Sequence, residues 1–148
     1  PEAHIVNIGS LAGLVPAHNR SVYTAAKAGL VGLSDSLRLV YGSQGLRVTL
    51  VCPGYVAGTG LFRRMLIAPG WRFQQPPRFE ADFLPVDEVA RQTVSAILED
   101  RPLVLCSRGE RFIWLLHRLF PSLVETLQRR LIRAGRLEIG GLRPVEEA

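Results

Sequence analysis

Two residues placed one helical turn apart, Tyr23 and Lys27, are the first candidates for chemistry in this chain. Residues four positions apart project from one face of a helix, so the phenol and the ammonium reach the same small volume. A free tyrosine has a pKa near ~10, and an adjacent lysine cation favours the phenolate and lowers that pKa. We therefore expect Lys27 to adjust Tyr23 for proton transfer.

Lys27 is also the one lysine in a chain that holds 18 lysine and arginine residues. An ammonium is a compact point charge, and the planar guanidinium of arginine is a poor substitute where a small cation must approach a phenol. Because arginine serves at every other basic position, the sequence favours a specific chemical role for this ammonium.

Ser10 is the third candidate, and it follows residues 5–8, an apolar run that predicts a strand covered on both faces. Open parallel sheets place ligands at the carboxyl ends of their strands, and the loop of residues 11–20 can return Tyr23 beside Ser10. A hydroxyl there can hold a substrate oxygen while Tyr23 donates or accepts the proton. The hydride for such a reaction must come from a cofactor.

The elements that position these groups alternate between strand and helix. After the first strand, a helical period with one apolar face runs from about Ser21 to Tyr41. The β-branched run from Arg47 to Cys52, stopped by Pro53, predicts the next strand. Strand, helix and strand in this order imply a parallel crossover, so the fold class is α/β.

The same alternation continues toward the C-terminus. Residues 54–85 are rich in glycine and proline and are expected to form a binding loop or lid. Asp87 is expected to cap the next helix, and Leu103 to Cys106 to form a third strand. Glu110 to about Ala134 predicts two helical segments broken near Pro121, before a Gly-rich, frayed tail.

Composition excludes several classes of function. The chain has no uninterrupted run of ~20 apolar residues, which argues against a membrane-spanning protein. The net charge of +5 comes from scattered arginines without a nucleic-acid motif, so no nucleic-acid partner is expected. Cys52 and Cys106 are too few for a disulfide framework and indicate buried thiols in the cytoplasm. His18 has no second ligand at metal spacing, so no metal site is expected.

Three segments together resemble the short-chain dehydrogenase/reductase family in motif, order and spacing. They are Ile5-Val6-Asn7-Ile8-Gly9-Ser10, Tyr23-Thr24-Ala25-Ala26-Lys27-Ala28-Gly29-Leu30 and Val48-Thr49-Leu50-Val51-Cys52-Pro53-Gly54. The resemblance is strong over residues 4–60 and diffuse beyond. It implies the C-terminal part of a doubly wound, parallel-sheet, Rossmann-like fold. It also implies an oxidoreductase that interconverts a small-molecule alcohol and a carbonyl with NAD or NADP.

The resemblance assigns roles to individual positions of this chain. The implied catalytic residues are Ser10, Tyr23 and Lys27. The implied cofactor contacts are Tyr23, Lys27, Pro53, Gly54 and Val56. The implied substrate contact is Ser10, and Tyr55 at the mouth of the site is expected either to touch substrate or to pack within the lid.

Two other positions qualify these assignments. The family usually has a threonine two positions after the valine, where this chain has Gly58, with Thr59 one place later. Asn7 lies inside the first predicted strand, and we expect it to hydrogen-bond to neighbouring backbone rather than to act in catalysis.

Parts of the family pattern have no counterpart in this sequence. The Gly-rich turn for the pyrophosphate, the residue that reads the ribose 2′ position and the asparagine upstream of the catalytic serine are missing. Since a strand follows Pro1 almost at once, we expect the chain to begin inside a fold and to bind dinucleotide poorly by itself. The alternative to an enzyme is a truncated, non-catalytic chain that acts as a binding or pairing module.

The predicted division places the C-terminal part of the dehydrogenase domain at 1–108 with the lid loop at 54–85, amphipathic helices at 109–136 and a tail at 137–148. The basic amphipathic helices can lie on a membrane surface, but the break at Pro121 favours covering the substrate cleft or a subunit interface. Both roles agree with an apolar or lipid-like substrate. The family resemblance also implies that two copies pair through the long helix.

Overall fold

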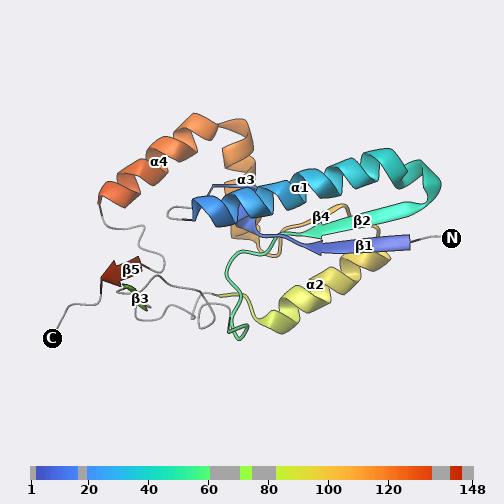
Figure 1. Cartoon of the computed structure of the whole chain (residues 1–148), viewed down its shortest axis with the longest axis horizontal. Helices are drawn as coiled ribbons and strands as arrows, with labels where there is room; N and C mark the ends of the chain where they lie inside the picture. Colours follow the sequence, from blue (N-terminus) through green and yellow to red (C-terminus); the bar gives the residue numbers. More distant parts are fainter. Residues whose placement is uncertain (1–2, 17–19, 61–70, 75–82, 135–140, 145–148) are drawn as a thin grey trace.

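A parallel sheet with helices on both faces forms the centre of the molecule (Figure 1). The structure is a computed structural model and describes residues 3–16, 20–60, 71–74, 83–134 and 141–144. The strands of this sheet pair in the order β1 (Ala3–Ile8), β2 (Leu46–Val51) and β4 (Leu103–Val104). Both pairs are parallel, which confirms the predicted α/β class, although β4 is shorter than expected.

The helices form where the hydrophobic pattern predicted them. α1 (Ser21–Tyr41) has the predicted bounds and lies on one face of the sheet, and α2 (Val86–Leu98) lies on the opposite face (Figure 1). α3 (Arg108–Leu119) and α4 (Pro121–Arg133) meet at the predicted break. Pro121 is the first residue of α4, a position where its missing N–H costs no helical hydrogen bond.

Alternate side chains at the end of β2 pack on opposite faces of the sheet. Leu50 and Cys52 pack with Leu30 of α1. Val51 lies between them in the sequence and packs with Ala96 of α2. The three consecutive residues are at most 1% exposed. This period of two with burial on both faces is typical of a parallel sheet between two helix layers.

Asn7 ties β1 to α1 through a side-chain hydrogen bond. Its Nδ2 donates to Oγ of Ser34 over 2.9 Å, and Ser34 donates to the Leu30 carbonyl over 2.7 Å. The prediction that Asn7 bonds to neighbouring backbone was wrong, because α1 presents the fully buried Ser34 hydroxyl to the strand. The amide is still satisfied, as a half-buried polar group must be.

Arg38 fixes the C-terminal half of α1 over the sheet. Its Nη1 donates to the carbonyls of Val48 and Pro102, over 3.0 and 3.1 Å. Its Nη2 pairs with Asp35 on the same helix. One guanidinium therefore holds three segments of the chain together.

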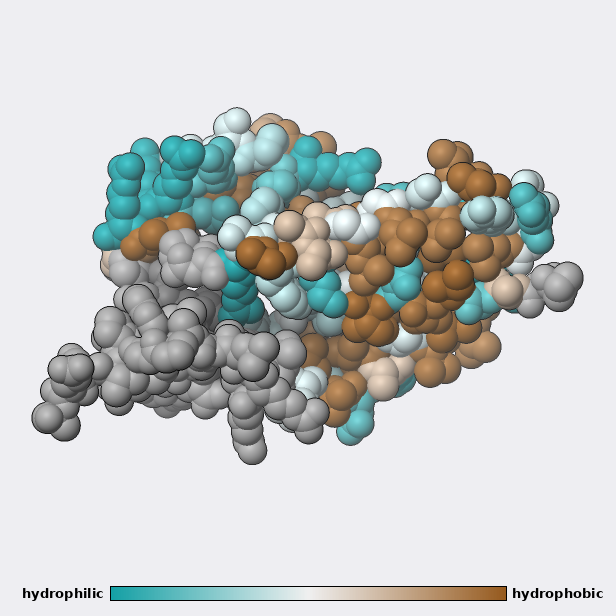
Figure 2. Space-filling model, viewed as in Figure 1, coloured by the Kyte–Doolittle hydropathy of each residue, from teal (hydrophilic) through white to brown (hydrophobic). Residues whose placement is uncertain are grey.

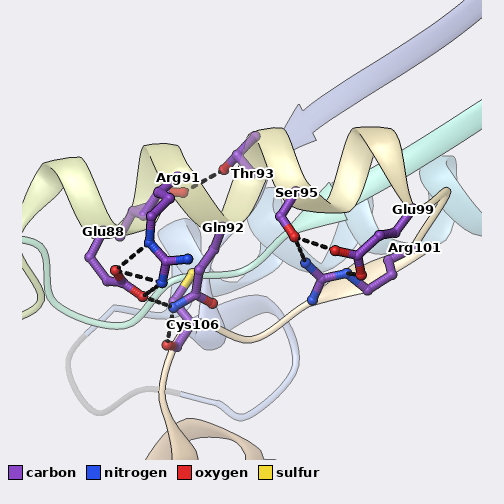
Figure 3. Close-up of polar contacts among 9 residues, drawn as sticks. Glu88, Arg91, Gln92, Thr93, Ser95, Glu99, Arg101 and Cys106 are labelled. Atoms are coloured by element: carbon purple, nitrogen blue, oxygen red, sulfur yellow. Dashed lines mark hydrogen bonds and ion pairs between the residues drawn. The ribbon is translucent and has the colours of Figure 1, made fainter.

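Hydrogen bonds along α2 fix the segment that leaves β4 (Figure 3). Gln92 donates from Nε2 to the Cys106 carbonyl over 2.8 Å and to Oε1 of Glu88 over 2.6 Å. Hydrogen bonds from Arg91 and then Gln92 hold the pKa of Glu88 below its ordinary value. Because Gln92 bonds to the main chain at Cys106, the start of the chain toward α3 is held against α2.

β1 is less covered than the sequence predicted. Ile5 is 38% exposed and Ile8 is 53% exposed, although a strand covered on both faces was expected. In the described part of the chain β1 is the outer strand, so α1 and α2 close over β2 more fully than over β1.

Two further features differ from the sequence analysis. The N-cap of α2 is Pro85, and Asp87 lies inside the first turn, where a carboxylate still interacts favourably with the helix dipole. β3 (Trp71–Gln74) and β5 (Gly141–Pro144) form an antiparallel pair that was not predicted, and β5 lies in the segment expected to be a frayed tail. Pairing between such distant segments leaves no local signal.

Apolar side chains gather on the surface near α1, β1 and α2 (Figure 2). The exposed large ones on these elements are Ile5, Ile8, Val22, Leu33, Leu39, Val40, Tyr41, Val86, Val94 and Leu98. A second exposed set, on and between α3 and α4, is Phe112, Ile113, Leu115, Leu119, Phe120, Leu123 and Leu127. Among the described residues no helix combines the length and the apolar character needed to cross a bilayer.

Cys52 and Cys106 are free thiols on opposite faces of the sheet, as the two packing clusters show. Burial raises the pKa of each thiol to about 11. Since they face different layers, a disulfide between them would require the sheet to open.

We expect both thiols to resist a disulfide reagent at pH 8 in the folded protein, because only about one thousandth of each is thiolate. Both should react after unfolding in guanidinium.

Since the pKa of each thiol rises from 9.0 to about 11 on folding, the unfolded state releases protons first, and the free energy of unfolding should fall between these pH values. Urea titrations across this range measure the fall. A Cys52→Ala/Cys106→Ala variant with the same pH slope as the wild type would contradict the assignment.

Candidate active site

The chains leaving β1 and β2 stay side by side beyond the ends of the strands. The Gly9 N–H donates to the Val51 carbonyl over 2.7 Å. The Leu11 N–H then donates to the Pro53 carbonyl over 2.9 Å. These two bonds place Ser10 next to the turn at Pro53, at the carboxyl end of the parallel sheet.

Ser10 is held in a defined backbone position. It is 8% exposed and precedes a single helical turn, η1 (Leu11–Gly13), which it caps. Its Oγ accepts the Ala12 N–H over 3.2 Å. Because this bond uses an acceptor site of the hydroxyl, the O–H proton is left to donate, which suits a residue that holds a substrate oxygen.

η1 packs directly on the main chain of α1. A Cβ at Gly13 would lie 2.7 Å from the carbonyl carbon and oxygen of Lys27, a separation that real side chains do not show. Glycine is therefore required at this position, and the close approach fixes the Ser10 loop at the level of Lys27 on the helix.

Lys27 and Tyr23 share the same face of α1, as their spacing predicted. Nζ of Lys27 lies 5.8 Å from the centre of the Tyr23 ring and donates to the Ile8 carbonyl over 2.9 Å. Both residues are half-buried. The ammonium therefore joins α1 to the end of β1, two residues before Ser10.

Cys52 lies against the chain that leaves β1, next to Ser10. Burial raises the pKa of its thiol to about 11, while a main-chain hydrogen bond from Ser10 and the charge of Lys27 act in the opposite direction. A Cβ at Gly9 would lie 2.9 Å from Sγ of Cys52, so the strand end rests directly on the sulfur.

Glu110 holds the turn at Pro53 and Gly54, and the sequence analysis gave it no role. Its Oε1 accepts the Gly54 N–H over 2.7 Å, and its Oε2 accepts the Ser107 N–H over 3.0 Å. The carboxylate belongs to a residue only 8% exposed. Ser107 and Glu110 form the Ser-x-x-Glu capping box of α3, a visible sequence signal that indicates a helix start and not a contact with a distant turn.

The two ends of the predicted lid loop are hydrogen-bonded to each other beside the site. The Ala57 N–H donates to the Leu84 carbonyl over 2.9 Å, and the Leu84 N–H donates to the Tyr55 carbonyl over 2.9 Å. Val56, a predicted cofactor contact, forms an isolated parallel bridge with Leu84. The middle of the predicted lid, at 61–70 and 75–82, lies outside the described residues, as does His18.

Tyr55 packs against the far end of the same loop. Its ring stacks on Phe83 with centroids 4.8 Å apart, and the guanidinium carbon of Arg20 lies 5.6 Å from its centre. Burial raises the pKa of Tyr55, Arg20 lowers it, and Tyr23 raises it further, which puts Tyr55 on the Tyr23 side of the site. These contacts agree with packing in the lid, and substrate contact by Tyr55 stays a prediction.

The chain matches the profile of the family described as short chain dehydrogenase over residues 1–66, the part that holds all the predicted site residues. An inactive 2-(S)-hydroxypropyl-CoM dehydrogenase of Xanthobacter autotrophicus is 47% identical over 62 residues, 42% of this chain and 27% of that protein. The ketoacyl reductase HetN of Nostoc is 35% identical over 100 residues, 67% of this chain and 34% of that protein. The chain belongs to the short-chain dehydrogenase/reductase family.

Solved structures of the family share the fold. A short chain dehydrogenase from Burkholderia cenocepacia in complex with NADP is similar with a TM-score of 0.65 at 18% identity, over 88% of this chain and 47% of that one. A short-chain dehydrogenase from Sphingobium yanoikuyae in complex with NADPH gives 0.60 at 22% identity, over 88% and 44%. This chain therefore spans less than half of these proteins and about a quarter to a third of the curated relatives above.

We expect Gly13→Ala to lower the free energy of unfolding by about 1–3 kcal/mol, because the methyl group meets main-chain atoms that cannot rotate away. Gly32→Ala on α1 is the matched control. A Cβ there meets nothing within 4 Å, so this variant should gain stability by up to about 1 kcal/mol from helix propensity. Urea denaturation compares the two, and a Gly13→Ala protein as stable as the wild type would refute the close approach.

Proposed function

We propose that this chain is the catalytic part of an NAD(P)-dependent oxidoreductase that interconverts an alcohol and a carbonyl. The Lys27 ammonium carries this proposal, because it is fixed by the Ile8 carbonyl and lies 5.8 Å from the Tyr23 ring centre. A cation beside a phenol, at the sheet edge where parallel folds place ligands, stabilises the phenolate that proton exchange requires.

Each residue then has a separate role in moving the proton. In the reducing direction Ser10 donates its O–H to the carbonyl oxygen, and Tyr23 gives its proton to the same oxygen as it becomes an alcohol. In the oxidising direction Tyr23 as phenolate takes that proton back. When bound, the nicotinamide supplies or accepts the hydride at the adjacent carbon.

The residues present fit the nicotinamide end of the cofactor. The Lys27 ammonium has three donors, and its one described hydrogen bond goes to the Ile8 carbonyl, so two donors remain for ribose hydroxyls. The turn at Pro53 and Gly54, which the family resemblance assigns to the nicotinamide, is held next to Ser10, because the Leu11 N–H donates to the Pro53 carbonyl over 2.9 Å. Two dehydrogenases of this fold are in complex with NADP or NADPH, which supports the same class of cofactor here.

A non-catalytic role is the competing proposal. One relative that is 47% identical over 62 residues is named an inactive dehydrogenase, so relatedness alone does not carry activity. A chain of this kind would act by pairing or binding through its exposed apolar faces.

The exposed apolar set of α3 and α4 supports an apolar or lipid-like substrate, in agreement with the name of a relative, retinol dehydrogenase 10 of Xenopus tropicalis, 34% identical over 108 residues. The same helices expose four arginines, which supports peripheral membrane contact as a lesser proposal; they are Arg111, Arg118, Arg129 and Arg130.

The exposed small residues of α1 support pairing of two copies. The free, buried thiols support a cytoplasmic location.

Tyr23→Phe in the full-length protein should reduce kcat for a carbonyl and alcohol pair by about a hundredfold or more, because the proton donor is removed. Binding of NAD(P)H, followed by nicotinamide fluorescence, should change little. Tyr41→Phe, at the exposed end of the same helix, is the control and should keep full activity. Undiminished turnover in Tyr23→Phe would overturn the proposed mechanism.

Fluorescence titration separates the enzyme from the pairing module. The full-length protein should bind NAD(P)H, and residues 1–148 alone should bind it much more weakly, because the sequence lacks the Gly-rich turn that receives the pyrophosphate. A full-length protein that binds no nicotinamide cofactor would favour the non-catalytic role.

A further inference from the structure

We propose that Glu110 is a positioning residue for the cofactor, acting through the turn at Pro53 and Gly54. The inference rests on the proposed oxidoreductase function. It assigns a buried carboxylate on α3, outside the predicted catalytic trio, to the placement of the nicotinamide-facing turn.

The two oxygens of this carboxylate bind two separate segments. Oε1 accepts the Gly54 N–H over 2.7 Å, and Oε2 accepts the Ser107 N–H over 3.0 Å. The Glu110 N–H donates back to Oγ of Ser107 over 3.1 Å, which completes the cap of α3. A capping box needs only the two bonds between Ser107 and Glu110, so the bond to Gly54 is not needed to start the helix.

The contact between Glu110 and the turn requires glycine at position 54. A Cβ at Gly54 would lie 2.7 Å from Oε1 of Glu110, so any other residue would displace the carboxylate. The N–H···O⁻ bond is short and charge-assisted, the strong class of hydrogen bond, and it is shielded because Glu110 is 8% exposed.

The restraint passes from this turn to the catalytic serine. The carbonyl of Pro53, next to Gly54, accepts the Leu11 N–H over 2.9 Å, and Leu11 follows Ser10. Glu110 therefore holds the turn at Gly54, and the Ser10 loop holds it at Pro53. Loss of the carboxylate frees the Gly54 side and leaves the Ser10 side attached.

The buried anion is stabilised where it lies. Glu110 occupies the first turn of α3, where free main-chain N–H groups and the positive end of the helix dipole favour a negative charge. Among the described residues its bonded partners are the main-chain N–H groups of Gly54 and Ser107 and no cation. The carboxylate is thus available to bind main chain without the competition of an ion pair.

The test compares Glu110→Ala with Ser107→Ala in the full-length protein. Both variants lose the capping box, and only Glu110→Ala loses the bond to Gly54. The ligands are NAD(P)H and the matching ADP-ribose fragment, which lacks the nicotinamide. Glu110→Ala should weaken NAD(P)H binding by about tenfold, the loss of one charge-assisted bond, with the fragment affected by less than about twofold. Ser107→Ala should leave both affinities near the wild-type values.

Glu110→Gln is the conservative variant, and it keeps the comparison possible if Glu110→Ala does not fold. It retains one acceptor oxygen, so its loss of NAD(P)H affinity should be smaller than tenfold but still specific to the nicotinamide-bearing ligand. If the Glu110 variants bind NAD(P)H with unchanged affinity, or lose as much affinity for the fragment as for NAD(P)H, the positioning role of Glu110 is overturned. The proposed function is not affected by either result. A wild-type protein that binds no NAD(P)H would instead overturn the proposed function and this inference with it.

Discussion

The parallel pairing of β1 with β2 is the constraint on which the site depends. Parallel strands end at the same edge of a sheet, so the residues that follow them emerge together. Here the pairing continues through Gly9 and Leu11, whose N–H groups bond to the Val51 and Pro53 carbonyls. A slip of one residue would exchange the faces to which the β2 side chains point and would turn the Cys52 side chain to the other face of the sheet.

Two opposite charges complete the main-chain hydrogen bonding at this edge. Beyond the end of a strand, carbonyl and N–H groups lose their ladder partners and must find others. The Lys27 ammonium donates to the carbonyl of Ile8, and the Glu110 carboxylate accepts the N–H of Gly54. Burial raises the pKa of the Cys52 thiol, and both charges act on it as well: Lys27 lowers this pKa and Glu110 raises it further. The two side chains that complete the backbone hydrogen bonding therefore also contribute to the electrostatic potential at Cys52.

Local periodicity predicted the central elements well. α1 begins and ends at Ser21 and Tyr41 as its apolar period indicated, and the strand of Leu46–Val51 ends before the predicted stop at Pro53. The membership in the dehydrogenase family and the α/β fold were also predicted correctly. The roles of the site residues stay predictions, because the geometry shows how they are held and not what they bind.

The features that the sequence did not reveal arise from contacts between distant segments. The need for glycine at position 13 comes from the main chain of Lys27, and the second function of Glu110 comes from Gly54. Neither contact is marked by a local period or turn signal. The exposure of Ile5 and Ile8 likewise depends on which strands lie beyond β1, and a strand's own residues do not record that.

The solitary lysine gains a physical explanation from these contacts. Nζ bonds to a carbonyl at the end of β1 and lies near the Tyr23 ring, and in the proposed function its remaining donors bind a ligand. A tetrahedral ammonium can direct its three N–H bonds in these different directions, whereas a guanidinium directs its donors within one plane. The guanidinium of an arginine bonded to the Ile8 carbonyl would distribute its charge over a larger planar group, and less of that charge would lie near the phenol. The chain uses arginine where one guanidinium nitrogen binds two carbonyls, as in Arg38, and lysine where a point charge lies beside the Tyr23 ring.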